Sequence, residues 1–82
     1  MTAREILAWA RVLIAAYLLE HSGWPIELIA WRVGFSDVAS LHRALRDRVR
    51  LRPSQLRSPG SVERVCGLFV GALEVAGAEA SS

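Results

Sequence analysis

A glycine followed by a phenylalanine, Gly34 and Phe35, interrupts a long stretch of helical periodicity and constrains the fold more than any other feature. Before this pair, apolar residues recur at helical spacing and predict a short amphipathic helix over residues 25–33. The stripe of this helix expected to face the core consists of Ile26, Ile29, Ala30 and Val33. Glycine adopts a positive φ at little cost, so Gly34 is expected to turn the chain sharply, with Phe35 between the flanking helices.

A second amphipathic helix is predicted directly after this turn, over residues 37–48. Ser36 is expected to cap its N-terminus, and Asp37 suits the positive end of the helix dipole. Its inward residues are expected to be Leu41, Leu45 and Ala44. The residues on its other side are Val38, Ala39, His42, Arg43 and Arg46. Two helices joined by a tight glycine turn, the second with a polar outer face, can place side chains in the major groove of DNA.

A longer helix is predicted ahead of this unit, over residues 3–21. Thr2 and Glu5 have the spacing of a capping box, which makes Thr2 the expected N-cap. The face expected to be buried consists of Ile6, Ala10, Leu13, Ile14, Tyr17 and Leu18. Ser22 and Gly23 are expected to end this helix, with Gly23 in the left-handed conformation, and Pro25 to open the next one.

Beyond residue 48 the sequence predicts a short turn and one further helix. A helical turn over residues 53–57 is expected to return Leu56 to the core, and Ser58, Pro59 and Gly60 mark an internal boundary. Ser61 is then expected to cap the last helix. The apolar face expected for that helix consists of Val62, Val65, Cys66, Phe69, Val70 and Leu73. Residues 76–82 are expected to fray.

These elements predict an all-α fold, a small helical bundle that contains a homeodomain-like helix-turn-helix and an extra C-terminal helix. The sequence has no strand-like alternation, and its 82 residues suffice for one domain with a modest core. We expect residues 1–57 to form the helix-turn-helix subdomain, and residues 58–82 to form a linker, a C-terminal helix and a frayed tail. The three tryptophans, Trp9, Trp24 and Trp31, are expected to pack in the core or at its rim rather than to stack on bases, with Trp31, beside Arg32, partly exposed.

Positive charge is concentrated in one part of the chain, although the net charge is only +2. Residues 32–57 carry seven arginines against two aspartates, whereas the segments on either side are both net negative. The guanidinium fork matches phosphate oxygens, which favours nucleic-acid binding. A solvated basic helix end, stabilised by the helix dipole, explains the same pattern, so charge alone leaves the two interpretations open.

Other classes of function find little support in the sequence. Cys66 is the single cysteine, which excludes an intrachain disulfide and favours a cytoplasmic protein. The apolar run over residues 6–19 is interrupted by Arg11 and is too short to span a membrane. The two histidines and the cysteine lack the spacing of metal ligands, and there is no glycine-rich phosphate loop. We therefore expect no enzyme activity, no cofactor and no metal.

The run from Ala10 to Arg57 resembles the second helix-turn-helix subdomain of the AraC/XylS family of bacterial transcription regulators. The residues that match the family pattern are Ala16, Leu18, Leu19, Ile26, Ile29, Ala30, Gly34, Phe35, Ser36, Asp37, Arg43, Arg46, Pro53, Ser54, Leu56 and Arg57. The chain departs from it at Leu41, Leu45 and Leu56, where aromatic residues are usual, and at Arg50, where glycine is usual. The resemblance implies sequence-specific DNA binding, with residues 37–48 as the recognition helix.

The resemblance also assigns roles to individual residues. The base-facing positions are Val38, Ala39, His42 and Arg43. The residues expected to contact phosphates are Ser36, Arg46, Arg50, Arg52 and Arg57. Each assignment has a simpler alternative: Arg43 paired with Asp47, a solvated His42, Val38 in the core, or Ser36 acting only as a cap.

Double-stranded DNA is thus the principal partner expected. RNA polymerase, a second helix-turn-helix unit, and a second copy joined through the C-terminal helix are further candidate partners. The alternative function is a protein-interaction module that keeps the helix-turn-helix shape and uses residues 61–73 as its contact surface. Simple packing of this helix on the bundle accounts for the same apolar pattern.

Overall fold

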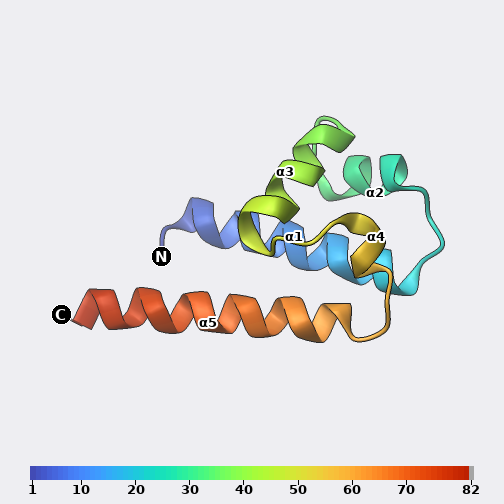
Figure 1. Ribbon diagram of the computed structural model, residues 1–82. Coiled ribbons are helices and arrows are strands. Elements are labelled where there is room, and N and C mark those ends of the chain that lie inside the picture. Colours follow the sequence, from blue (N-terminus) through green and yellow to red (C-terminus); the bar gives the residue numbers. More distant parts are fainter. Residues whose placement is uncertain (82) are drawn as a thin grey trace.

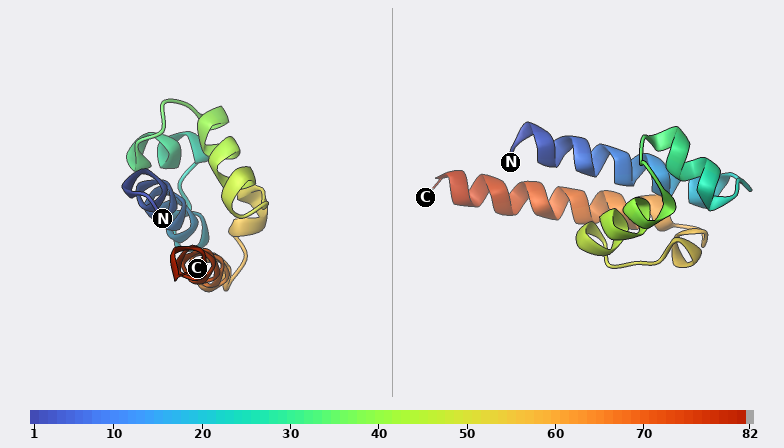
Figure 2. Two further views of the ribbon diagram at one scale, coloured as in Figure 1. Left: turned by 90° about the vertical axis from the view of Figure 1, so that its left-hand side faces the viewer. Right: turned by 90° about the horizontal axis from the view of Figure 1, so that it is seen from above.

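A computed structural model describes residues 1–81, and the side chains of residues 1–79 are described within it. The helices are α1 (Ala3–His21), α2 (Ile26–Val33), α3 (Val38–Arg48), α4 (Pro53–Leu56) and α5 (Ser61–Ser81). Helix α1 lies at the centre, with α2 and α3 on one side of it and α5 antiparallel to it on the other (Figures 1 and 2). The predicted all-α fold is confirmed.

Helix α1 begins as the sequence predicts but ends differently. The Glu5 backbone N–H donates to the Thr2 hydroxyl oxygen at 3.2 Å, so Thr2 is the N-cap. At the other end Ser22 is the C-cap, with an extended backbone, and its N–H and hydroxyl both donate to the Leu18 carbonyl. The prediction of a left-handed Gly23 is wrong, because the serine supplies the cap. Pro25 precedes α2 as its N-cap rather than forming its first residue.

The buried face of α1 is not the predicted one. Its buried residues are Trp9, Val12, Ala15, Ala16 and Leu19. Ile6, Ile14 and Tyr17 are instead about half exposed, and Ala10, Leu13 and Leu18 are half-buried. Apolar residues occupy most of the circumference of α1, so periodicity alone does not select which side the rest of the chain covers.

The turn between α2 and α3 forms as predicted. Gly34, the C-cap of α2, has a left-handed backbone conformation with a φ of 105°. The Phe35 N–H donates to the Ala30 carbonyl at 2.9 Å, which completes the C-terminal cap of the helix. Phe35 packs against the core between the two helices. The cap of α3 is Asp37, however, and not Ser36, because an Asp37 carboxylate oxygen accepts the Ser40 N–H at 2.7 Å. This bond, with smaller contributions from the Ser40 hydroxyl and the Arg43 charge, lowers the pKa of Asp37.

Helix α5 is held at its start by a carboxylate from α1. The two Glu20 carboxylate oxygens accept the Gly60 N–H at 3.0 Å and the Val62 N–H at 2.7 Å. Glu20 therefore provides the cap that was predicted for Ser61, whose hydroxyl donates to the Ser58 carbonyl at 2.6 Å. These backbone hydrogen bonds lower the pKa of Glu20, with a further contribution from neighbouring His21.

The apolar face of α5 is also rotated from the predicted one. Val65 is buried in the common core, with Phe69 and Ala72 packed against it, whereas Cys66, Val70 and Leu73 are exposed. Residues 76–81, which were expected to fray, continue α5 as helix in the structure, and Ser82 lies outside the described residues. Alanine, the strongest helix former, occupies positions 76, 78 and 80, which offsets the single glycine at 77 and favours continuation of the helix.

Replacing Glu20 with glutamine should lower the free energy of unfolding, because an uncharged amide is a weaker acceptor for the two N–H groups than a carboxylate. Urea denaturation followed by circular dichroism measures the change. Glu74→Gln, on the exposed surface in the middle of α5, is a matched control that should leave stability near that of the parent.

The same carboxylate gives stability a defined pH dependence. The pKa of Glu20 in the folded chain is lower than its ordinary value of 4.5, so its contribution is complete above that value and is lost as pH falls through the folded pKa. Glu20→Gln should flatten this acid limb of the stability curve. Equal acid sensitivity in the variant and the parent would show that the cap does not stabilise the fold.

Candidate nucleic-acid interface

The outer face of α3 is open to solvent while its inner face is fixed in the core. Leu41 and Leu45 are completely buried, and burying a leucine side chain stabilises a fold by about 1.5–3 kcal/mol. The residues that line one shallow hollow on the outer face are Val38, Ala39, His42, Arg43 and Arg46. All of these are exposed except Val38, which is half-buried against the core. Helix α5 packs on α1 and α4, and it leaves this outer face of α3 uncovered (Figure 1).

A recess beside α3 gathers part of the arginine block. It has a volume of about 290 Å³ and is lined by His42, Arg46, Arg50, Leu51, Arg52 and Pro53. Pro53 is buried and Leu51 half-buried, so these two hold the loop between α3 and α4 against the bundle. Three guanidinium groups and an imidazole around one opening make this recess suitable for an anion.

Arg50 reaches this recess through an unusual backbone conformation. Its φ of 56° is the only positive value at a non-glycine position in the described part of the chain. The N–H groups of Val49 and Arg50 both donate to the Leu45 carbonyl, at 2.8 and 2.9 Å, which ends α3. Glycine suits this conformation best, and the AraC-type pattern has glycine here. The chain therefore keeps the turn of the pattern while placing a cation where the pattern has no side chain.

Two other arginines of the basic block have contacts within the fold. Arg57 donates to the Trp24 carbonyl at 2.7 Å and to the Ser22 carbonyl at 3.4 Å, which ties α4 to the loop before α2. Arg48 lies over the ring of Trp9, 5.9 Å from its centroid, a cation–π contact. Sequence reasoning missed both roles, since the partners lie more than thirty positions away along the chain.

Arg43 is available on the surface. The predicted alternative was an ion pair with Asp47, but within residues 1–81 the partner of Asp47 is Arg46, at 3.8 Å. Both members of that pair are more than two-thirds exposed, so its contribution to stability is small. Ser36 is exposed as well, with its hydroxyl 3.3 Å from that of Ser40.

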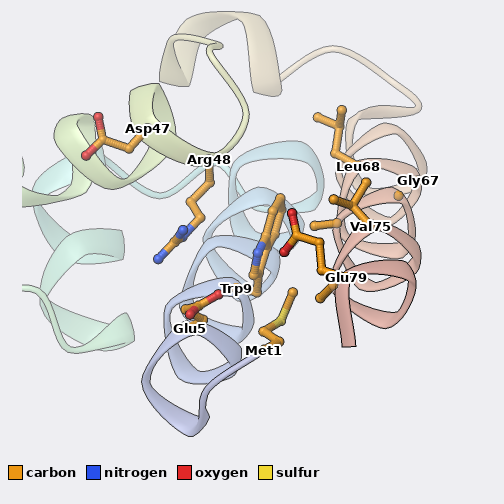
Figure 3. Close-up of a pocket in the computed structure, with 12 residues that line it drawn as sticks. Met1, Glu5, Trp9, Asp47, Arg48, Gly67, Leu68, Val75 and Glu79 are labelled. Carbon is orange, nitrogen blue, oxygen red and sulfur yellow. The ribbon is translucent and has the colours of Figure 1, made fainter. Parts of the chain in front are cut away.

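A larger hollow of about 620 Å³ lies between α1, α5 and the end of α3 (Figure 3). Trp9 forms its floor, 5.4 Å from the ring of Phe69, and its rim carries Glu5, Asp47 and Glu79 beside Arg48. The excess of carboxylates makes this hollow unsuited to phosphate. Among the described residues no group of histidine, cysteine and acidic side chains could hold a metal ion, and no helix is long and apolar enough to cross a membrane.

The fold and the exposed face of α3 define a helix-turn-helix protein. The chain matches the helix-turn-helix domain family over residues 1–59, and it belongs to this family in its AraC/XylS form. The comparison with curated proteins found no match, nor did the comparison with solved structures. The family consists of DNA-binding regulatory domains rather than enzymes, so the general function of this chain is DNA binding in regulation.

Replacing Arg50 with glycine should raise the free energy of unfolding by about 0.5–1 kcal/mol, because a left-handed backbone costs other residues more than it costs glycine. Thermal or urea denaturation measures the gain. Arg52→Gly is the matched control: Arg52 has a φ of −82°, and glycine there should destabilise the chain. A loss of stability in both variants would mean that Arg50 is not strained.

Proposed function

We propose that this chain binds duplex DNA sequence-specifically as an AraC-type transcription regulator, with α3 as the recognition helix in the major groove. The observation that carries the proposal is the pairing of an anchored inner face on α3 with an uncovered, cationic outer face. A helix fixed by Leu41 and Leu45 holds its outer side chains in a defined register, which reading bases requires.

In this proposal the side chains around the shallow hollow on α3 contact the bases. Arg43 has no ion-pair partner in the described chain, and its guanidinium suits the O6 and N7 acceptors of guanine. His42 adds one further hydrogen-bonding group. Ala39 and the exposed part of Val38 offer apolar contact of the kind that a thymine methyl accepts.

The phosphate contacts fall mainly to the recess beside α3. Arg46, Arg50 and Arg52 surround it, and each guanidinium can neutralise a phosphate and release counterions. Ser36 lies just before α3 and offers a hydroxyl to the backbone on that side. Arg57 contributes its charge at the other edge, where it lines a hollow with His42 and Arg52 while bonded to the Trp24 carbonyl.

Arg43→Ala and Arg46→Ala should weaken DNA binding in different ways. Loss of a bidentate guanine contact costs about 1–3 kcal/mol, so Arg43→Ala should reduce discrimination between selected and random duplexes about 10- to 100-fold. Arg46→Ala should weaken both duplexes alike and make the slope of log affinity against log salt shallower by about 0.9. Fluorescence anisotropy titrations at several salt concentrations measure both effects.

Arg64→Ala is the control for charge, since Arg64 is an exposed arginine on α5. It should leave both the sequence preference and the salt slope nearly unchanged. If all three variants bind like the parent, α3 is not the DNA-binding surface. If all three lose affinity equally, the chain binds DNA through its overall charge and not through the recognition helix.

A second candidate function is protein interaction through α5. Leu68 and Val75 are 42% and 60% exposed beside the hollow of Figure 3, more than simple packing on the bundle leaves open. Val75→Glu should then abolish association with a partner while leaving DNA binding intact. If the partner is a second copy of the chain, sedimentation should give a higher mass for the parent than for the variant.

A further inference from the structure

An apolar surface without charge runs along α1 and continues onto α5. We call it the α1–α5 face, and its members are Ile6, Leu7, Ala10, Ile14, Tyr17, Val70 and Leu73. All of them are exposed except Ala10, which is half-buried. Exposed fractions of 47% for Ile6, 51% for Ile14 and 55% for Tyr17 are unusual for large side chains on the central helix of a bundle.

Helical geometry places these residues on one side of the molecule. Each residue of a helix is turned by about 100° from the one before, so Ile6, Tyr17 and Ile14 lie about 60–140° around α1 from Trp9. They lie on the side of Trp9 opposite buried Val12, and so away from α3. On α5, Leu73 is likewise turned about 160° from Val75, which faces the hollow on the α3 side (Figure 3).

The chemistry of the α1–α5 face restricts what can cover it. None of its members is charged, and Arg11, which shares the helix, is turned away so that its guanidinium lies beside Gly34. Ionisable groups stand only at its edges: His21, whose ring lies 4.8 Å from that of Tyr17, and Glu74, one turn beyond Val70. A nucleic acid or a strongly charged protein would find little complementary charge here. A second copy of the same face meets this requirement, because pairing opposes no like charges across the contact.

The size of the face is enough for a weak dimer. Six large side chains, each about half exposed, leave roughly 600 Å² open per copy, so pairing two copies buries at most roughly 1,200 Å², the lower limit of a specific interface. The largest apolar patch of an ordinary monomer measures about 300–600 Å² and is often functional, so this face stands at the upper end of that range.

We propose that two copies of this chain associate through the α1–α5 face, with their α1 helices antiparallel and Ala10 at the centre. The small Ala10 side chain allows the two helix backbones to approach closely. In this register Ile6 of each copy lies opposite Ile14 of the other, so each half-exposed isoleucine gains an apolar neighbour. In the same arrangement the two α1 dipoles are antiparallel, so opposite partial charges lie side by side.

This association does not rest on the DNA-binding proposal. The association itself requires no DNA.

Sedimentation equilibrium of the full chain over a wide concentration range tests the proposal. The parent should reach twice the monomer mass in the upper micromolar range, and Ile14→Glu should weaken association at least about tenfold, since pairing would bury its charge. Ile6→Glu is a second variant on the same face. Trp31→Glu, 70% exposed on α2 and away from the α1–α5 face, is the matched control and should associate like the parent. Val75→Glu tests the other candidate surface, the hollow beside α5.

Each remaining outcome decides against the proposal. A parent that stays monomeric throughout shows that this face does not join two copies of the chain. Weakening by Val75→Glu alone assigns association to the α5 hollow. Circular dichroism melting confirms that the variants are folded. Because Arg43→Ala should dimerise normally and Ile14→Glu should still bind a single half-site, failure of this proposal and failure of the DNA-binding proposal are distinguishable.

Discussion

The two-sided burial of α1 is the constraint on which the other helices depend. Val12, Ala15 and Ala16 are completely buried, and the two alanines allow close approach of neighbouring helices where bulkier side chains would not. Helices α2 and α3 cover one side of α1, and α5 covers another (Figure 2). An 82-residue chain can bury only limited surface, and here one central helix packs against the other helices on two of its sides.

This core separates the arginines by their roles. Arg48 and Arg57 are drawn into contacts that join helices, whereas Arg43, Arg46 and Arg50 remain on the outer side of α3 or beside it. Net charge therefore understates the cationic character of that side. The positive φ at Arg50 belongs to the same arrangement, since it adds a guanidinium at a corner where a glycine would be more stable.

Local signals in the sequence were reliable where a single residue or a short spacing determines structure. The Thr2 cap, the Gly34 turn and the burial of Leu41, Leu45 and Leu56 were all predicted correctly, because each follows from backbone conformation or from an unambiguous apolar stripe. The exposed residues of the candidate interface were found for the same reason, because they lie on the side of α3 opposite its buried apolar residues. Their contacts with DNA stay predictions.

Features that depend on distant partners were not accessible from the sequence. The orientation of α1 was wrong because the helix is apolar nearly all round, and Cys66 was wrongly placed inside because α5 is apolar over much of its circumference. The Glu20 cap joins groups 40 and 42 positions apart, and no local pattern marks it. The cap forms only after Glu20 and the start of α5 have come together, because the chain between them must first close a long loop. The Gly60 and Val62 amides are protected only while this contact is intact. Their hydrogen exchange therefore reports the docking of α5 onto α1, separately from the opening of the helix-turn-helix.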